Sequence, residues 1–323
     1  MKRWLLSVIL CLYGSLIWAE PEDQLIQVLR ALQQGHIDKA LSSAEVLKKT
    51  YPNYRLGQLL WLQLNATLAG DTDLLARLQQ RHGMALQRLL AEAQVRWEHA
   101  RDPLSPQQWV QRWILRPGSQ PWWVVVDLAG SRLYLFRNQN GQLVKVFDTY
   151  VSKGRKGIGK QREGDQRTPV GIYRIVDWIP DEKLPPLYGV GALPLDYPNP
   201  WDRLYGRTGS GIWLHGAPPD TWTRPPLSSR GCVVMSNQGV TALRQRFQLP
   251  FGTPVLLVDR LADYPPLATL PQALPPQAMV ARYPGEAKLV WVAHPDGTQA
   301  FWQSDGEGGW QLALKAPPVL AQR

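Results

Sequence analysis

The spacing of apolar residues changes near Pro117, and this change constrains the fold more than any other feature of the 323-residue chain. Upstream of it, apolar residues recur three and four positions apart, which is typical of helices that bury one face. Downstream of it, short apolar runs alternate with turn residues, which indicates strands. We therefore predict a helical region over residues 20–117 and a mainly β region after it.

Two glycines divide the helical region. Gly35 and Gly70 each follow an apolar helical run, and a period of 35 residues separates them. Periods of this length are typical of stacked helix pairs. The order Gly35, Ala40, Leu47 and Pro52 resembles the second half of a tetratricopeptide unit, and an irregular helical bundle is the alternative. Either fold predicts a docking or spacing module with a protein partner, and the histidines of this region share no metal-ligand spacing.

The β region begins with an apolar run at residues 122–126, and similar runs follow at 133–136 and 143–147. Turn residues separate these runs, so we expect an antiparallel meander. Further strands are predicted at 171–176, 211–215 and 253–258, with a short helix at 240–247. Together these elements predict a mainly β domain, a sandwich or barrel with one or two short helices, over residues 118–261.

Two segments of the β region have an unusual composition. Residues 178–210 are rich in Pro, Gly and aromatic residues, which predicts a lid or binding loop. Residues 262–323 begin with a proline-rich stretch, typical of a semi-rigid linker, and end in alternating apolar runs that predict a small β tail. The sequence leaves open whether this tail packs on the preceding domain or grips a substrate.

The first nineteen residues have the pattern of a signal peptide. Residues 1–3 are basic, an apolar run extends to Trp18, and the small residue Ala19 precedes Glu20. The run is shorter than the roughly 20 residues that a membrane span needs. We expect cleavage after Ala19 and a periplasmic protein with no transmembrane span in the mature chain. An uncleaved N-terminal anchor is the alternative.

The charge of the chain favours anionic partners. Its formal net charge is +10 at pH 7, and removal of Lys2 and Arg3 with the signal leaves +8. An exported protein rarely meets nucleic acid, so we expect none as a partner, and anionic cell-wall polymer or lipid headgroups fit the compartment better. A solvated basic surface is the simpler interpretation of the same charge.

Cys232 is the candidate nucleophile. The other cysteine, Cys11, lies in the signal segment, so the exported chain carries one unpaired thiol into an oxidising compartment. His215 ends a predicted strand, and an imidazole can take the thiol proton and later give it to a leaving amine. The backbone N–H groups of Gly231 and Cys232 are candidates for an oxyanion site. Ser229 or a backbone carbonyl is the candidate partner that orients the imidazole.

Two motifs resemble the signature of the L,D-transpeptidase catalytic domain, also called the YkuD-type domain. They are residues 211–216, Gly-Ile-Trp-Leu-His-Gly, and residues 229–233, Ser-Arg-Gly-Cys-Val. Weaker matches lie at Gly164-Asp165, at residues 168–173 and at residues 251–255. The resemblance covers residues 120–260 and implies a mixed β fold and an acyl-enzyme mechanism.

The resemblance also implies an enzyme of cell-wall biogenesis and cell shape that modifies peptidoglycan. In this family the thiolate attacks the L,D bond of a stem peptide, D-alanine leaves, and an amine, a lipoprotein lysine or water resolves the thioester. By motif position Cys232 resembles the nucleophile and His215 the general base and acid. Gly231 with Cys232 matches the oxyanion donors, and Ser229 matches the orienting hydroxyl. No metal or cofactor is implied.

Two positions depart from the common family pattern. Arg230 stands where many members have His, and Val234 stands where many have Arg or Asn. The run around Cys232 instead resembles a sub-branch that includes hydrolytic members. An L,D-carboxypeptidase, or an amidase that releases wall-linked lipoprotein, is therefore an alternative to a transpeptidase.

The substrate carboxylate then needs a partner other than the usual arginine. A guanidinium binds carboxylate in bidentate fashion, so Arg230 or Arg207 is expected to replace it. Gly216 and Tyr197 complete the expected substrate-binding set. An inactive wall-binding scaffold is the alternative from another class. A papain-like protease is disfavoured because His precedes Cys in this chain.

Overall fold

The structure is a computed structural model, and it describes residues 21–101, 105–261, 267, 269–272 and 274–318. The predicted signal peptide and Cys11 lie outside these residues. Contacts divide the chain into two compact units. The helical unit comprises the chain up to Arg101 together with Asp220–Pro225, and the β unit comprises Asp102–Pro219 and Pro226–Arg323. In the described part of the chain, no helix combines the length and the apolar character that a membrane span requires.

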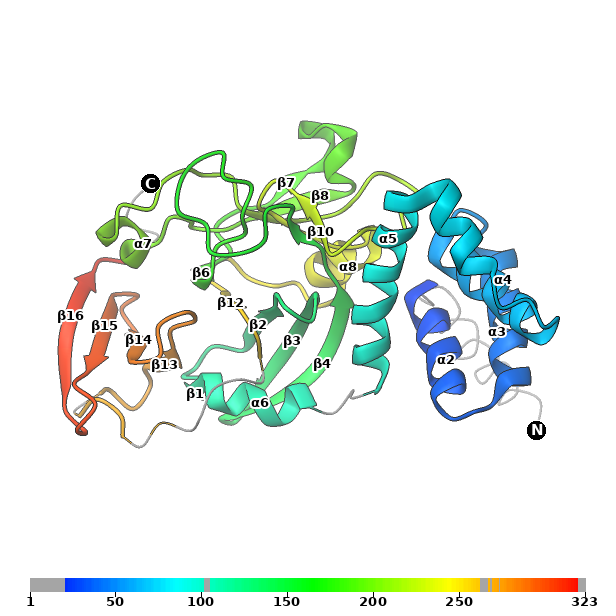
Figure 1. Ribbon diagram of the computed structural model, residues 1–323. Helices are drawn as coiled ribbons and strands as arrows, with labels where there is room; N and C mark the ends of the chain where they lie inside the picture. Colours follow the sequence, from blue (N-terminus) through cyan, green and yellow to red (C-terminus); the bar gives the residue numbers. More distant parts are fainter. Residues whose placement is uncertain (1–20, 102–104, 262–266, 268, 273, 319–323) are drawn as a thin grey trace, which may run out of the picture. The chain divides into compact units, whose positions relative to one another are not determined.

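The helical unit consists of α2 (Pro21–Gln33), α3 (Ile37–Thr50), α4 (Arg55–Leu68) and α5 (Leu74–Arg101), coloured blue to cyan in Figure 1. Gly35 and Gly70 have φ angles of 73° and 76°, a left-handed conformation that glycine adopts without steric cost. Each follows the end of a helix, as the sequence predicted. The apolar faces of the helices form buried clusters that include Leu25, Leu29, Leu47 and Leu56.

A buried ion network joins α2 to α5. Arg96 Nη1 donates a hydrogen bond of 2.8 Å to Glu22, and Arg96 Nε and Nη2 donate bonds of 3.0 and 2.9 Å to Glu92. Burial raises the pKa of Glu92 to about 7, because it outweighs the opposing effect of the Arg96 charge. The network therefore holds a carboxyl group that is reluctant to ionise.

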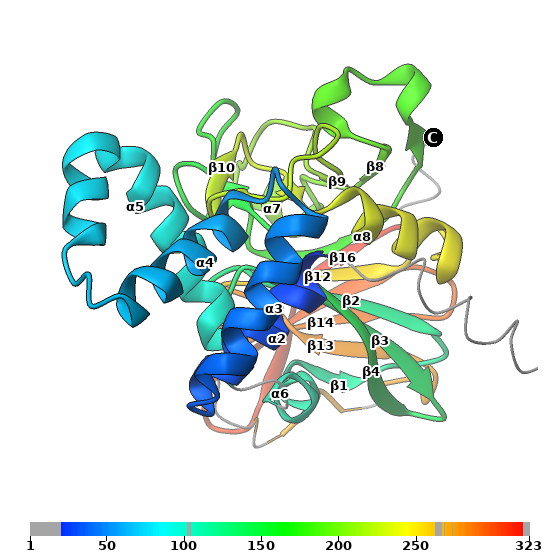
Figure 2. The same cartoon turned by 90° about the vertical axis from the view of Figure 1, so that its right-hand side faces the viewer.

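The main sheet of the β unit contains the predicted meander. Strands β2 (Trp122–Asp127), β3 (Arg132–Gln139) and β4 (Gln142–Tyr150) pair in antiparallel register. Strand β12 (Pro254–Val258) pairs parallel to β2 and antiparallel to β6 (Gly171–Arg174). The order is β4-β3-β2-β12-β6, and Figure 2 shows β4, β3 and β2 side by side. This mixed sheet confirms the mainly β class.

A second sheet carries the candidate site. Its order is β11-β9-β8-β7, formed by β11 (Val233–Val234), β9 (Trp213–His215), β8 (Gly191–Pro194) and β7 (Ile179–Pro180). Strands β5 (Lys153–Gly154) and β10 (Leu227–Ser229) form a separate parallel pair, and β10 ends shortly before Cys232. Buried residues of the main sheet and of this second sheet share one core, among them Val124, Leu135, Leu214, Val233 and Leu257.

Two predicted segments differ from the structure. Residues 178–210 contain regular elements rather than an open loop: β7, the 3₁₀ turns Asp181–Lys183 and Pro186–Tyr188, β8 and α7 (Pro200–Leu204). The predicted helix at 240–247 begins earlier, as α8 (Asn237–Thr241), and continues as a π-helical turn over Ala242–Arg246. Ser236 caps α8 by accepting a hydrogen bond from the Gly239 N–H, which explains the earlier start.

The C-terminal tail packs on the main sheet. Strands β13 (Met279–Arg282), β14 (Leu289–Ala293), β15 (Gln299–Ser304) and β16 (Trp310–Ala316) form a sheet that β1 (Ile114–Arg116) completes. Trp291 of β14 meets Trp123 of β2 edge to face, with ring centroids 6.4 Å apart. Helix α6 (Ser105–Trp113) buries Trp113 in the same core. These contacts place α6 and β1 in the β unit, whereas the sequence grouped them with the helices.

Candidate active site

The second sheet brings His215 and Cys232 to one place. His215 is the last residue of β9, as predicted, and Cys232 immediately precedes β11. The two strands pair in parallel, with Val234 opposite His215. The Cys232 thiol donates a hydrogen bond of 3.3 Å to the Gly211 carbonyl, just before β9 begins. The imidazole therefore lies at the end of β9, and the sulfur lies just before its partner strand β11.

The Cys232 thiol is not an activated thiolate in this state. Burial raises its pKa to about 11, and the backbone N–H of Trp213 and the charge of Lys160 oppose this by smaller amounts. The hydrogen bond to the Gly211 carbonyl also favours the protonated thiol. The sequence indicated an imidazole that can take the thiol proton, and the raised pKa describes a neutral thiol that must lose this proton to react.

The ring of His215 has the tautomer that a general base needs. Its Nδ1 lies 2.7 Å from the Gly216 carbonyl oxygen, which can only accept a hydrogen bond. Nδ1 therefore carries the proton, and Nε2 keeps its lone pair. The Tyr188 ring packs edge-on against the imidazole at 4.8 Å and limits its rotation. Of the two partners considered from sequence, the backbone carbonyl orients the ring.

Ser229 acts on the cysteine loop. Its Oγ donates a hydrogen bond of 2.6 Å to the Cys232 carbonyl and accepts one of 3.0 Å from the Gly231 N–H. The Gly231 N–H is therefore engaged. The Cys232 N–H has no acceptor within the residues that the structure describes. We infer that the Cys232 N–H is the better candidate for an oxyanion donor.

A buried threonine fixes the backbone of the cysteine loop. Gly231 has a φ angle of 132°, and a Cβ atom there would lie 2.9 Å from the Arg167 carbonyl oxygen. Thr168 Oγ1 donates a hydrogen bond of 2.9 Å to the Gly231 carbonyl and accepts one of 2.8 Å from the Gly154 N–H. The Thr-Pro motif found in the sequence thus supports the loop that carries the candidate nucleophile.

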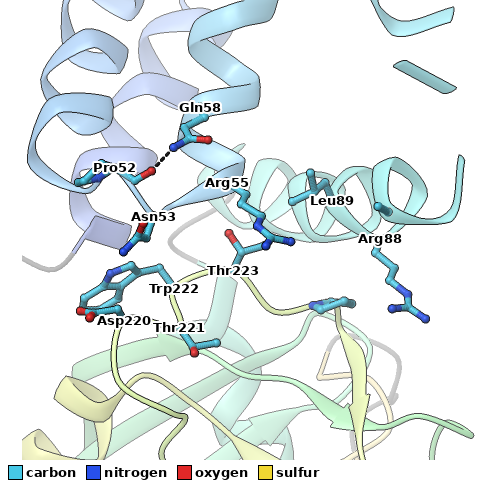
Figure 3. Close-up of a pocket in the computed structure, with 12 residues that line it drawn as sticks. Pro52, Asn53, Arg55, Gln58, Arg88, Leu89, Asp220, Thr221, Trp222 and Thr223 are labelled. Carbon is cyan, nitrogen blue, oxygen red and sulfur yellow. Dashed lines mark hydrogen bonds between the residues drawn. The ribbon is translucent and has the colours of Figure 1, made fainter. Parts of the chain in front are cut away.

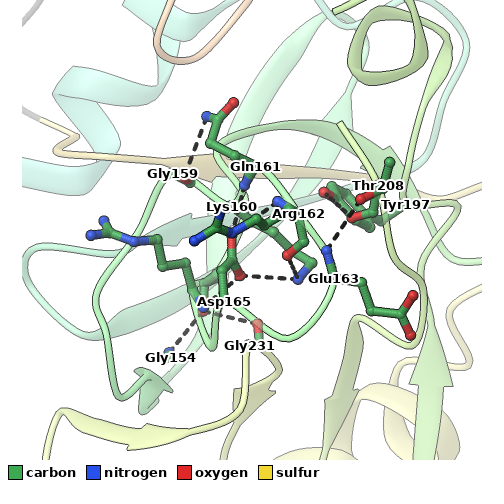
Figure 4. A network of polar contacts seen from close by, with 12 residues as sticks. Gly154, Gly159, Lys160, Gln161, Arg162, Glu163, Asp165, Tyr197, Thr208 and Gly231 are labelled. Carbon is green, nitrogen blue, oxygen red and sulfur yellow. Dashed lines mark hydrogen bonds and ion pairs between the residues drawn. The ribbon is translucent and has the colours of Figure 1, made fainter. Parts of the chain in front are cut away.

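The turn before Thr168 is built around one carboxylate, shown in Figure 4. Asp165 Oδ2 accepts hydrogen bonds from the N–H groups of Gln161 and Arg162 at 2.8 and 3.1 Å. Asp165 Oδ1 accepts bonds of 3.1 Å from the Arg167 N–H and from Lys160 Nζ. Burial raises the pKa of Asp165, but these donors outweigh it and lower the pKa to about 2.

Lys160 is the charged group of this turn that acts on the thiol. Its side chain is 4% exposed, and Nζ also donates a hydrogen bond of 3.0 Å to the Arg162 carbonyl. Its charge lowers the pKa of Cys232, against the larger effect of burial. Sequence reasoning missed Lys160, although it lies five residues before the Asp165 of the matched Gly-Asp motif.

The two arginines predicted to bind substrate have different surroundings. Arg207 Nη1 donates a hydrogen bond of 2.9 Å to Asp202, and Nη2 lies 3.9 Å from Glu286. Its guanidinium therefore already faces carboxylates of the chain itself. Arg230 is exposed beside Gly231 and has no ion-pair partner among the described residues. Arg230 is the arginine that remains available to a ligand.

Tyr197 and Gly216 are enclosed by the chain. Tyr197 is 5% exposed, and its hydroxyl donates a hydrogen bond of 3.1 Å to the Thr208 carbonyl. A Cβ atom on Gly216 would lie 2.2 Å from Asn237 Oδ1, so this position requires glycine. Both residues are therefore held by contacts within the chain. Within the described residues, no three His, Cys, Asp or Glu side chains gather as a metal site.

A thiol and an imidazole beside paired strands, with an N–H group at the thiol, are the groups that cysteine acyl transfer would require. Residues 121–257 match the model of the L,D-transpeptidase catalytic domain, YkuD.

Two known proteins illustrate the similarity. The chain is 30% identical over 149 residues to "Putative L,D-transpeptidase YafK" of Escherichia coli (strain K12), a match that covers 41% of this chain and 55% of YafK. The chain therefore spans about half the length of the curated relatives it matches. The crystal structure of the helical cell shape determining protein Pgp2 from Campylobacter jejuni is similar at a TM-score of 0.50 and 18% identity, over 65% of this chain and 98% of that one. At 18% identity this similarity shows that the two proteins share a fold.

Proposed function

We propose that this protein is an exported enzyme that modifies peptidoglycan by cysteine acyl transfer at the L,D bond of stem peptides. The observation that carries the proposal is the pairing of β9 with β11, which groups His215 and Cys232 within an L,D-transpeptidase domain. Export through residues 1–19 to the periplasm is part of the proposal. We expect N-terminal sequencing of the mature protein to begin at Glu20.

In the proposed reaction, His215 Nε2 takes the thiol proton as Cys232 Sγ attacks the carbonyl carbon before D-alanine. A C–S bond forms, and the new oxyanion is stabilised by the Cys232 N–H. When the tetrahedral intermediate collapses, the C–N bond breaks and His215 returns the proton to the amine of D-alanine. An acceptor amine then attacks the thioester, the C–S bond breaks, and the thiol is restored.

The raised thiol pKa gives His215 a defined task. A thiol with a pKa of about 11 is almost entirely protonated at pH 7. We therefore propose that proton transfer to the imidazole accompanies attack. This arrangement also protects the resting thiol, because oxidation and alkylation both require thiolate character.

Hydrolysis is the second candidate, with water as the acceptor of the acyl group. Val234 is buried in β11 opposite His215, so the position where many family members have Arg or Asn holds an apolar side chain. The site then lacks a polar group at that place to hold an acceptor peptide. An L,D-carboxypeptidase, or an amidase that releases wall-linked lipoprotein, would follow from this difference.

Replacement of Cys232 by Ala tests the mechanism. We expect turnover of tetrapeptide stems to fall by about a thousandfold or more, and the covalent adduct with a carbapenem to disappear. Mass spectrometry of muropeptides after incubation separates cross-links, trimmed stems and released lipoprotein in one experiment. Full turnover by the Cys232→Ala protein would show that the proposed mechanism is wrong, whereas no turnover by the unaltered protein would favour the wall-binding scaffold.

A further inference from the structure

The helical unit contains a pocket of about 590 Å³ that no step of the proposed reaction uses. Its walls come from the turn before α4, from α5, and from residues 220–225, which belong to this unit. Figure 3 shows Arg55 and Arg88 approaching the pocket from the helices and Trp222 from the third wall.

The charges around the pocket are unbalanced. Arg55 and Arg88 both line it, both are exposed, and neither has an ion-pair partner among the described residues. Asp220 is the acidic residue that lines the same pocket. Leu89 and Trp222 add an apolar surface between these groups. Two free guanidinium groups beside an apolar wall suit a ligand that has carboxylates on a partly apolar body.

Helix α4 adds further donors at the same place. It begins at Arg55, and its N-cap residue Tyr54 provides no side-chain hydrogen bond. The N–H of Leu56 donates a long hydrogen bond of 3.4 Å to Thr223 Oγ1. The first N–H groups of a 14-residue helix carry partial positive charge. A carboxylate held by Arg55 would therefore also meet a favourable helix end.

The third wall links the pocket to the candidate active site along the chain. Trp222 packs edge-on against Tyr51 with ring centroids 5.6 Å apart, and Thr223 accepts the hydrogen bond from α4. In the sequence this wall lies in the loop between His215 and Cys232. An occupant of the pocket therefore contacts the chain segment that joins the two candidate catalytic residues.

We propose that this pocket binds a carboxylate-bearing peptide, and that the bound peptide restrains residues 220–225. Arg55 and Arg88 take carboxylates, and Asp220 takes an amino group. A peptidoglycan stem peptide that contains diaminopimelate carries both kinds of group, and this choice of peptide rests on the proposed function. The pocket would then be a second recognition site for the wall, distinct from the one that reacts.

The test uses the full mature chain with Cys232→Ala, so that no turnover occurs, and the stem tetrapeptide as the probe. Hydrogen exchange should show protection in residues 51–58 and 220–225, and calorimetry should detect binding. We expect the double change Arg55→Ala and Arg88→Ala to weaken this binding about tenfold and to abolish that protection. Arg81→Ala, an exposed arginine of α5 outside the pocket, is the matched control and should leave both unchanged.

Three outcomes would overturn the proposal. The first is protection confined to residues 211–217 and 229–235, which would mean that the peptide binds at the thiol alone. The second is unchanged affinity in the double variant. The third is binding of a glutamate-rich peptide without binding of the tetrapeptide, which would assign the pocket to an acidic protein segment. None of these outcomes depends on catalytic activity. A failure of the proposed reaction would be recognised separately, by turnover measurements on the protein that keeps Cys232.

Discussion

Two buried networks, one in each unit, pair a carboxylate with a cation, yet they shift the pKa of the carboxyl in opposite directions. Burial raises the pKa of both groups. For Asp165, three backbone N–H groups and Lys160 outweigh burial and lower the pKa to about 2. For Glu92, which is fully buried, the Arg96 charge does not compensate, and the pKa rises to about 7. Glu92 is fully buried, whereas Asp165 is only partly buried and accepts four hydrogen bonds, so the degree of burial and the donors together decide the direction.

The two networks therefore respond to pH with opposite sign. The Asp165 contribution to stability is present above the ordinary pKa of 3.8 and is lost as pH falls toward about 2. The Glu92 penalty is absent below the ordinary pKa of 4.5 and develops as pH rises toward about 7. At neutral pH, Asp165 thus stabilises the turn beside the candidate active site, whereas ionisation of Glu92 lowers the stability of the helical unit.

Replacement of Asp165 by Asn should have the largest effect, because it removes the charge that compensates buried Lys160. We expect the free energy of unfolding to fall by about 3 kcal/mol. Urea denaturation at pH 7 measures this loss. Asp181→Asn, at an exposed position, is the control and should change stability by less than about 0.5 kcal/mol. A loss below about 1 kcal/mol for Asp165→Asn would show that the backbone donors hold the turn without the charge.

Replacement of Lys160 by Met should have an effect of intermediate size, and this effect should be on the reactivity of the Cys232 thiol. Loss of the nearby positive charge raises the pKa of Cys232 further, so alkylation by iodoacetamide at pH 8 should slow by about threefold to tenfold. The rate of alkylation against pH, with the unfolding midpoint measured in parallel, checks this. Lys156→Met, an exposed lysine of the same segment, should leave the profile in place. An identical profile for both variants would remove Lys160 from the site.

Replacement of Glu92 by Gln should have the smallest effect on the free energy of unfolding. The sign of this effect should reverse with pH. The amide keeps the shape and leaves Arg96 paired with Glu22. We expect a change in unfolding free energy within about 1 kcal/mol at pH 5 and a relative gain for the variant at pH 8. Glu98→Gln, on the exposed side of α5, should show no such pH dependence. Equal destabilisation of Glu92→Gln at both pH values would mean that the ionised pair stabilises the helical unit.

The sequence sufficed for features that depend on neighbouring residues. The meander, the helix ends at Gly35 and Gly70, and the strand that ends at His215 all follow from local patterns, and the structure confirms them. The motif around Cys232 identified the family domain that residues 121–257 match.

Features that depend on distant contacts could not be predicted. Thr168 reaches Gly231 across 63 residues, and no periodicity marks that hydrogen bond. Strand β1 was assigned to the helical region because its partner β13 lies near the other end of the chain. The raised pKa of Cys232 depends on burial, which the two motifs do not encode.

The placement of Asp220–Pro225 in the helical unit has a consequence for folding. The ribosome makes α2 to α5 well before it makes Trp222, so the cluster around Tyr51 lacks one of its aromatic rings while those helices first form. That ring arrives on a chain whose flanking strands, β9 and β10, must also find their partners. The part of the polypeptide that is made first is therefore completed late, only after the loop that precedes Cys232 has been made.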